Sequence, residues 1–249
     1  MRSQVRILPG AFRRLAVPSS GAVRILLMAS PDFELRLEGH RARSASREPG
    51  LPQKLLKRIL RPVLRAWRTT VDGLHRIPES GGVLVAPNHG SYLDHFFLAY
   101  RIDRPVHFMA AAELFSNPAV GRILSSLGAF PVRRGMHDAE AVATAEAILD
   151  RGGLVVIYPQ GGIRSSIDSV PPRRGVGVLA LSTGAPVIPA AIIDATALHR
   201  SGFLRLPKMT VRFGPSLITA RRPSVTADQA EEEATRIWDD VVRLHSAGH

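Results

Sequence analysis

Residues 82–100 read GVLVAPNHGSYLDHFFLAY, and this stretch decides the fold. The apolar run at 83–86 suits a buried strand, a Pro-Asn pair interrupts it, and a helical pattern of apolar residues begins at Ser91. Another apolar, β-branched run at 154–158 is typical of a buried parallel strand. We therefore expect a single α/β domain with a mostly parallel central sheet flanked by helices, a fold that 249 residues can build.

A histidine and an aspartate, His89 and Asp94, lie five residues apart between this strand and this helix. The carboxylate can accept a hydrogen bond from one ring nitrogen, which leaves the other nitrogen free to take a proton from a hydroxyl. The spacing also fits a simpler role, because Ser91 and Asp94 form a Ser-x-x-Asp capping box that would serve only the helix start. The two residues alone leave both roles open.

The sequence NHGSYLD resembles the Asn-His-x-Ser-x-x-Asp block of the glycerolipid acyltransferases, the family that includes 1-acylglycerol-3-phosphate acyltransferase. Later blocks follow in the family's order: GAFPVRR at 128–134, YPQGGIRS at 158–165 and APVIPAAI at 185–192. The resemblance spans residues 52–220. It implies transfer of a fatty acyl group from acyl-CoA or acyl carrier protein to a hydroxyl of a phosphate-bearing lysolipid, with 1-acylglycerol 3-phosphate as the expected acceptor.

In this reaction His89 would deprotonate the acceptor hydroxyl, Asp94 would orient the imidazole, and the hydroxyl oxygen would attack the thioester directly. A serine nucleophile at Ser91 is a less favoured alternative, because the chain lacks a Gly-x-Ser-x-Gly elbow. The backbone N–H groups near Gly90 or Gly161 are candidates for the oxyanion donors. We expect no metal and no cofactor other than the acyl donor itself.

The resemblance also indicates the acceptor side of the site. In a strand over 128–134, Phe130, Val132 and Arg134 would share one face, and the family places an arginine at Arg134 to hold the acceptor's phosphate. Glycines in the PQGGIRSS loop let backbone N–H groups approach an anion. The expected substrate-binding residues are Asn88, Ser91, Phe130, Arg133, Arg134, Gln160, Gly161, Gly162 and Arg164.

One block departs from the family pattern Pro-Glu-Gly-Thr-Arg-Ser. Gln160 stands in the place of the glutamate, Gly162 replaces the threonine, and Arg164 comes one position later than the family's arginine. A carboxamide can form hydrogen bonds but cannot carry charge or act as a base. The departure predicts a different acceptor preference, or alternatively a catalytically weakened paralogue that binds lipid or acyl chains.

The chain divides into three expected segments. Residues 1–50 lack a sustained hydrophobic period and predict a disordered basic arm without a secretory signal, and translation is expected to start downstream, for example at Met28. Residues 51–70 predict a basic amphipathic helix, which either lies in a membrane interface or packs on its own domain with a solvated charged face. Residues 71–249 form the acyltransferase domain, in which 209–213 is expected to be an edge strand.

The composition restricts the partners. A net charge of +12 calls for an anionic partner, and an anionic membrane surface fits better than nucleic acid, because no nucleic-acid motif is present and aromatic content is 6%. The absence of cysteine excludes disulfides and a cysteine acyl-enzyme. No apolar run reaches 18 residues, so we predict a peripheral protein on the cytoplasmic face of the cell membrane.

Overall fold

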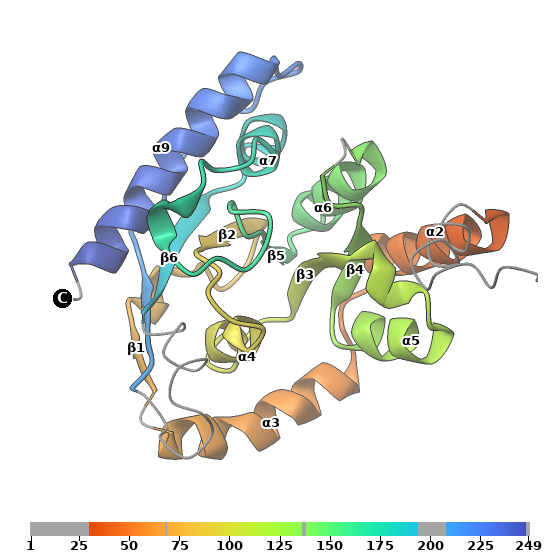
Figure 1. Cartoon of the computed structure of the whole chain (residues 1–249), viewed down its shortest axis with the longest axis horizontal. Helices are drawn as coiled ribbons and strands as arrows, with labels where there is room; N and C mark the ends of the chain where they lie inside the picture. The colour runs from red at the N-terminus through yellow and green to blue at the C-terminus, as the bar shows by residue number, and fades with distance from the viewer. Residues whose placement is uncertain (1–29, 68, 136–137, 194–207, 248–249) are drawn as a thin grey trace, which may run out of the picture.

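The computed structural model describes residues 30–67, 69–135, 138–193 and 208–247. Their centre is a seven-stranded sheet in the order β1-β7-β6-β2-β5-β3-β4, with helices on both faces (Figure 1). The strands from β2 to β6 run parallel to one another, whereas β7 is antiparallel to β6 and β1 runs parallel to β7. The predicted α/β class and mostly parallel sheet are confirmed. The strands are β1 (Thr70–Asp72), β2 (Val83–Pro87), β3 (Val106–Ala111), β4 (Ala129–Val132), β5 (Leu154–Val156), β6 (Val187–Ile193) and β7 (Thr210–Phe213).

Two hydrophobic clusters cover the two faces of the sheet. Along β2, Val83 and Val85 point to one cluster and Leu84 and Ala86 to the other, as the alternation of a strand requires. The first cluster includes residues of α3 and α4, and the second includes residues of α6, α7 and α9. This gives a three-layer arrangement that holds the central strands rigidly. These helices are α3 (Leu51–Ala66), α4 (Asp94–Ala99), α6 (Ala139–Asp150), α7 (Gly175–Thr183) and α9 (Ala227–Ser246).

A third cluster lies beside β4, and it corrects the prediction of disorder for the end of the basic arm. Helix α2 (Pro31–Ser46) packs Phe33 and Leu37 against α5 (Pro118–Ser126) and the 3-10 helix η2 (Ala112–Phe115). Its buried Arg41 pairs with Asp138 at 2.7 Å. The sequence pattern did not predict this helix, because an arginine that is buried against a distant carboxylate cannot be told from a solvent-exposed arginine in the sequence. Residues 1–29, including Met28, lie outside the described residues.

Helix α3 is present where the basic amphipathic helix was expected, and it continues through Pro62. Two of its polar side chains point inward instead of to solvent. Lys57 Nζ donates to the carbonyls of Ile102 and Arg104 at 2.9 and 2.6 Å, and Gln53 exchanges hydrogen bonds with the backbone of Val106. These contacts fix α3 across the ends of α4 and β3.

The prediction that residues 209–213 form an edge strand is wrong. Strand β7 is paired on both sides, with β6 and with β1. Strand β1 has only three residues and an exposed-intermediate-exposed pattern, so it carries no hydrophobic signal by which the sequence could reveal it. The remaining short helices are η1 (Leu74–Arg76) and η3 (Ile167–Ser169).

Candidate active site

The candidate site lies where β2 and β5, which are parallel neighbours, both end. In open α/β sheets, ligands bind at the carboxyl ends of such strands. The loop after β2 carries His89, and the loop after β5 carries Gln160 and Arg164. Two hydrogen bonds join these loops: the His89 N–H donates to Gln160 Oε1 at 2.7 Å, and the Arg164 N–H donates to the His89 carbonyl at 2.8 Å. Both backbone groups of His89 are therefore held by the second loop.

The side chains of His89 and Asp94 meet as their spacing suggested. His89 Nδ1 lies 2.8 Å from Asp94 Oδ2. A carboxylate oxygen can only accept, so Nδ1 carries the proton and Nε2 presents its lone pair. Among the described residues Nε2 has no hydrogen-bond partner. The imidazole is 3% exposed, which leaves a narrow approach to a ring whose tautomer is suited to accepting a proton.

The capping role and the orienting role of Asp94 are performed by the same oxygen. Asp94 Oδ2 also accepts the backbone N–H groups of Gly90 and Ser91, at 2.8 and 2.9 Å, just before α4 begins. Ser91 Oγ accepts the N–H of Leu93 at 3.2 Å. The turn thus fixes the carboxylate, and the carboxylate fixes the ring.

Two further rings enclose His89. Tyr158 stacks on it with ring centroids 4.0 Å apart and 23° between the planes, and His95 meets it edge-on at 5.4 Å. Burial, followed by the neighbouring His89, lowers the pKa of His95 to about 4, so His95 is neutral at physiological pH. Burial raises the pKa of the Tyr158 hydroxyl well above its usual value, and nearby Asp94 adds to that effect. Sequence reasoning did not assign Tyr158, because it looked like the last residue of a buried strand.

The amides of Gly90 and Gly161 themselves do not serve as the predicted oxyanion donors. The N–H of Gly90 donates to Asp94, and the N–H of Gly161 donates to the Tyr158 carbonyl at 3.0 Å. Both amides are therefore occupied within the protein. Gly162 borders open space, since a Cβ atom there would meet no atom within 4 Å.

Asn88 and Gln160 have the contacts of residues that position the loops. Asn88 exchanges two hydrogen bonds with the backbone of Ile192 in β6, at 2.6 and 2.9 Å. Gln160 is 1% exposed, and besides accepting the His89 N–H it donates to the Ser166 carbonyl at 3.3 Å. Both carboxamides are thus engaged with the backbone beneath the site.

The structure does not bring Phe130 and Arg133 to the site. Phe130 is fully buried in the cluster shared with α6, α7 and α9. Arg133 forms an ion pair with Glu34 of α2. The adjacent Arg134 is exposed, and no ion pair engages it among the described residues. Its charge contributes to lowering the pKa of His95, which places it near the rings around His89.

Two more arginines lie along the second loop. Arg164 is half-buried, and its backbone N–H holds His89. Arg173 lies against Gly161: a Cβ atom at Gly161 would come within 3.1 Å of Arg173 Cγ, and Gly161 has a φ of +67°. Only glycine suits this position. Sequence reasoning left Arg173 out of the site, because it looked like a charge that precedes a helix.

The described residues contain no group of three His, Asp or Glu side chains that could hold a metal ion.

The chain resembles known proteins in sequence. Residues 68–193 match the family model described as Acyltransferase. The chain is 32% identical over 149 residues to the 1-acyl-sn-glycerol-3-phosphate acyltransferase of Bacillus subtilis (strain 168), an alignment that covers 53% of this chain and 74% of that protein. It is 33% identical over 149 residues to the protein of the same name from Neisseria meningitidis serogroup B, covering 57% and 58% of the two chains.

A solved structure has a similar fold. The crystal structure of the 1-acyl-sn-glycerophosphate (LPA) acyltransferase PlsC from Thermotoga maritima superposes with a TM-score of 0.56 at 17% sequence identity. The superposition covers 91% of this chain and 88% of that chain, so the two share their overall fold.

Proposed function

The chain belongs to the glycerolipid acyltransferase family, and from this we propose that it transfers a fatty acyl group from a thioester to the free hydroxyl of 1-acylglycerol 3-phosphate, which yields phosphatidic acid. The acceptor is supported by the names of the Bacillus and Neisseria relatives. The observation that carries the proposal is the 2.8 Å contact between His89 Nδ1 and Asp94 Oδ2, which leaves Nε2 as the base.

In the proposed reaction, His89 Nε2 accepts the proton of the acceptor hydroxyl while the hydroxyl oxygen attacks the thioester carbonyl. Asp94 stabilises the imidazolium that forms. The tetrahedral intermediate collapses, the carbon–sulfur bond breaks, and the proton passes from the imidazolium to the leaving thiolate. Base catalysis of this kind contributes about 10²- to 10⁴-fold to the rate.

We assign the acceptor's phosphate to Arg134. Arg134 is exposed and acts electrostatically on His95, whereas Arg133 is engaged by Glu34. A guanidinium offers two parallel N–H donors to a phosphate. This assignment puts the phosphate on the side of β4 and the reacting hydroxyl at His89.

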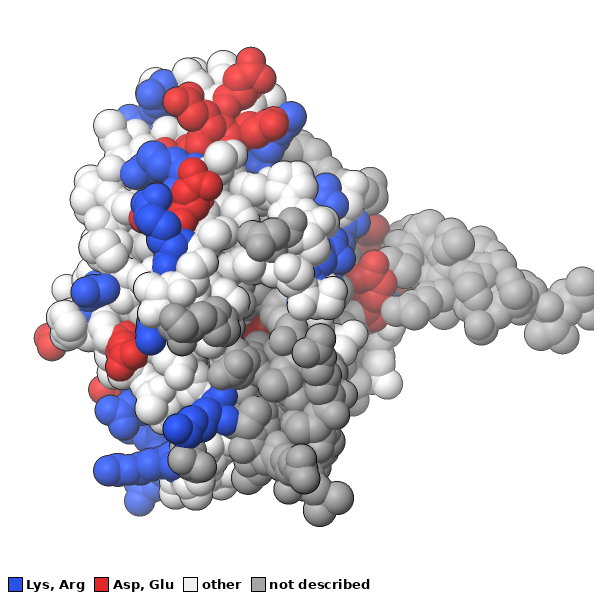
Figure 2. Space-filling view, turned by 60° about the vertical axis from the view of Figure 1, so that its left-hand side comes forward, with Lys and Arg blue, Asp and Glu red and all other residues white. Residues whose placement is uncertain are grey.

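We also propose that α3 binds the surface of an anionic membrane on its cytoplasmic face. Leu60 and Leu64 of the helix and its C-cap residue Trp67 pack inward, but four other apolar side chains of the helix are more than half exposed. Figure 2 shows Lys and Arg side chains gathered at the lower left of this face, and acidic side chains together with basic ones at the top. None of the described helices is both long and apolar enough to cross a bilayer. The exposed apolar residues of α3 are Leu51 (75%), Leu55 (53%), Ile59 (56%) and Val63 (51%).

The test of the reaction is thiol release from acyl-CoA in the presence of 1-acylglycerol 3-phosphate, with the lipid product identified by mass spectrometry. His89→Ala should lower release at least about 100-fold. His75→Ala is the control, because His75 is exposed and lies in η1, outside the site. Equal release by wild type and His89→Ala would refute the assignment of the base. Replacing acyl-CoA by acyl carrier protein, and the acceptor by other lysolipids, identifies the two substrates.

A further inference from the structure

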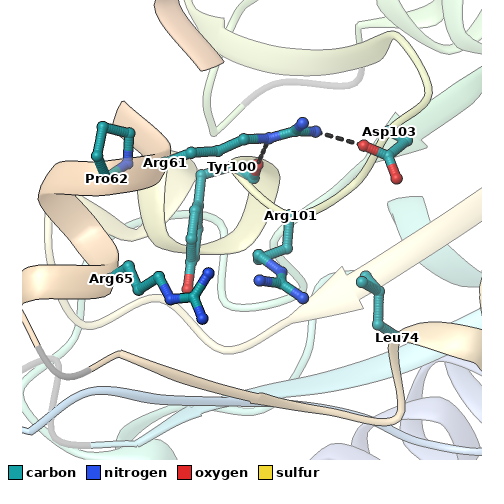
Figure 3. Close-up of a pocket in the computed structure, with 7 residues that line it drawn as sticks. All are labelled: Arg61, Pro62, Arg65, Leu74, Tyr100, Arg101 and Asp103. Atoms are coloured by element: carbon teal, nitrogen blue, oxygen red, sulfur yellow. Dashed lines mark hydrogen bonds and ion pairs between the residues drawn. The ribbon is translucent and has the colours of Figure 1, made fainter. Parts of the chain in front are cut away.

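A cavity of about 410 Å³ lies apart from His89, between α3 and the segment that follows α4 (Figure 3). Helix α3 supplies one wall, and the end of α4 with the residues after it supplies the other. One apolar side chain from η1 completes the lining. The lining residues are Arg61, Pro62, Arg65, Leu74, Tyr100, Arg101 and Asp103. None of them has a role in the proposed reaction.

The cavity carries an excess of positive charge. Three of its lining residues are arginines, and the single carboxylate among them, Asp103, already forms an ion pair with Arg61. Arg61 is further fixed by a hydrogen bond from Nε to the Tyr100 carbonyl at 3.1 Å. Within the described ranges, neither Arg65 nor Arg101 forms an ion pair. Two guanidinium charges therefore remain without a counter-ion.

Figure 3 shows the guanidinium groups of Arg65 and Arg101 extending from opposite walls into the same space, next to the Tyr100 hydroxyl. Charges of the same sign at close range repel each other, and an anion between them would remove that cost. Burial raises the pKa of the Tyr100 hydroxyl, so it stays neutral and can donate a hydrogen bond. The arrangement offers two planar cations and one hydroxyl donor, a set that suits a phosphate group.

The position of the cavity on α3 indicates the source of that phosphate. Ile59 and Val63, which lie six and two residues before Arg65 on the same helix, are 56% and 51% exposed. An apolar helix edge that enters the lipid interface would place the neighbouring basic side chains at the level of the headgroups. A phosphate reaching the cavity from that direction belongs to a membrane lipid.

We propose that the cavity between α3 and α4 is a binding site for the phosphate of an anionic phospholipid in the bilayer, separate from the site at His89. The inference rests on the membrane contact proposed for α3 but not on the reaction. Its tests measure binding without an acyl donor, so loss of the proposed activity and loss of lipid binding can be told apart.

The experiment compares two double variants of the full chain that each remove two positive charges. Arg65→Gln with Arg101→Gln empties the cavity of its unpaired cations. Lys54→Gln with Arg58→Gln removes two exposed cations from α3 that do not line the cavity. Sedimentation with vesicles of phosphatidylcholine alone, or of phosphatidylcholine with phosphatidylglycerol, measures the preference for the anionic lipid. A surface cation contributes about 1 kcal/mol to membrane binding wherever it lies. The nonspecific attraction to the anionic vesicle should therefore fall by the same amount in the two double variants.

We expect the cavity variant to lose at least about 10 times more of its anionic-lipid preference than the matched control, because bidentate contacts exceed general attraction. A charge-preserving variant, Arg65→Lys with Arg101→Lys, should fall between wild type and the glutamine variant. Equal losses in the two glutamine variants would overturn the proposal. The proposal would also be overturned if the cavity variant lost binding of inorganic phosphate or free coenzyme A but kept the wild-type preference for anionic vesicles. Melting temperatures check that each variant is folded.

Discussion

The side-chain oxygen of Gln160 accepts a hydrogen bond from the backbone N–H of His89 at 2.7 Å. Gln160 is also the residue that departs from the family's glutamate. A carboxamide oxygen accepts from an N–H group much as a carboxylate oxygen does, and its amide adds a donor to the Ser166 carbonyl. The Gln160 side chain is 1% exposed, so it lies beneath the site and supports His89 from there. The substitution therefore preserves the support of the base.

The first prediction concerns this support. Gln160→Ala leaves the buried His89 N–H without an acceptor, which should lower the free energy of unfolding by about 1–3 kcal/mol. Displacement of the imidazole should also lower kcat about 10- to 100-fold. Gln160→Glu keeps the acceptor and should retain more activity than Gln160→Ala. Denaturant melts and steady-state kinetics of both variants check this, and an alanine variant with wild-type kcat would contradict it.

The second prediction concerns the oxygen that holds the ring. Asp94→Asn cannot present the same charge to His89 while accepting the N–H groups of Gly90 and Ser91. We expect kcat to fall about 10²- to 10⁴-fold with little change in KM. Because the two residues act as a unit, His89→Ala combined with Asp94→Asn should be no slower than His89→Ala alone. Additive losses in the double variant would show that they act independently.

The third prediction separates the ring of Tyr158 from its hydroxyl. The hydroxyl is buried and has no partner among the described residues, so Tyr158→Phe should raise the free energy of unfolding by up to about 1 kcal/mol. Tyr158→Leu removes the ring that stacks on His89 at 4.0 Å and should lower kcat about 10-fold. Thermal melts and thiol-release kinetics distinguish the two effects. A loss of stability in the phenylalanine variant would mean that the hydroxyl has a partner.

What the sequence predicted well depends on short distances along the chain. His89 and Asp94 lie five residues apart within one turn, so their contact follows from local geometry. The alternation of strands and helices along the chain is also a local pattern, and it was enough to predict a mostly parallel sheet. Most boundaries of the helices and strands fall within a few residues of those expected, as for the helix predicted at 51–70 and found at Leu51–Ala66.

What the sequence did not predict depends on partners far away. Arg133 and Arg134 are adjacent, yet only the fold shows that Glu34, 99 residues before Arg133, engages the first of them. Arg41 is buried for a similar reason, since Asp138 lies 97 residues away. The sequence placed Phe130 on the same strand face as Arg134, but in the fold Phe130 packs into the core beside α6, α7 and α9.

The fourth prediction concerns the exposed apolar edge of α3. Ile59→Ser combined with Val63→Ser should weaken vesicle binding by at least about 10-fold, because each side chain is worth about 1.5–3 kcal/mol when buried. The melting temperature should be unchanged, since both residues are more than half exposed. Ile218→Ser is the matched control, because Ile218 is 71% exposed and lies outside α3. If the control weakens binding equally, the membrane contact does not lie on α3.

The last prediction is a pH dependence of stability that arises at His107 on β3. This side chain is 1% exposed, and its Nε2 lies 3.0 Å from Arg151 Nη2. Burial, followed by the charge of Arg151, lowers the pKa of His107 from 6.5 to about 3. Between these pH values the unfolded chain binds a proton that the folded chain does not, so acidification favours unfolding.

The free energy of unfolding contributed by this group is constant above pH 6.5 and falls as the pH drops from 6.5 toward 3, by roughly 3–5 kcal/mol in total. His107→Gln keeps an acceptor for Arg151 but does not titrate, so its stability should fall less steeply than that of the wild type over this range. His75→Gln, at an exposed histidine, should follow the wild type. Denaturant melts at several pH values measure the three slopes, and parallel slopes for wild type and His107→Gln would show that His107 can be protonated without unfolding the protein.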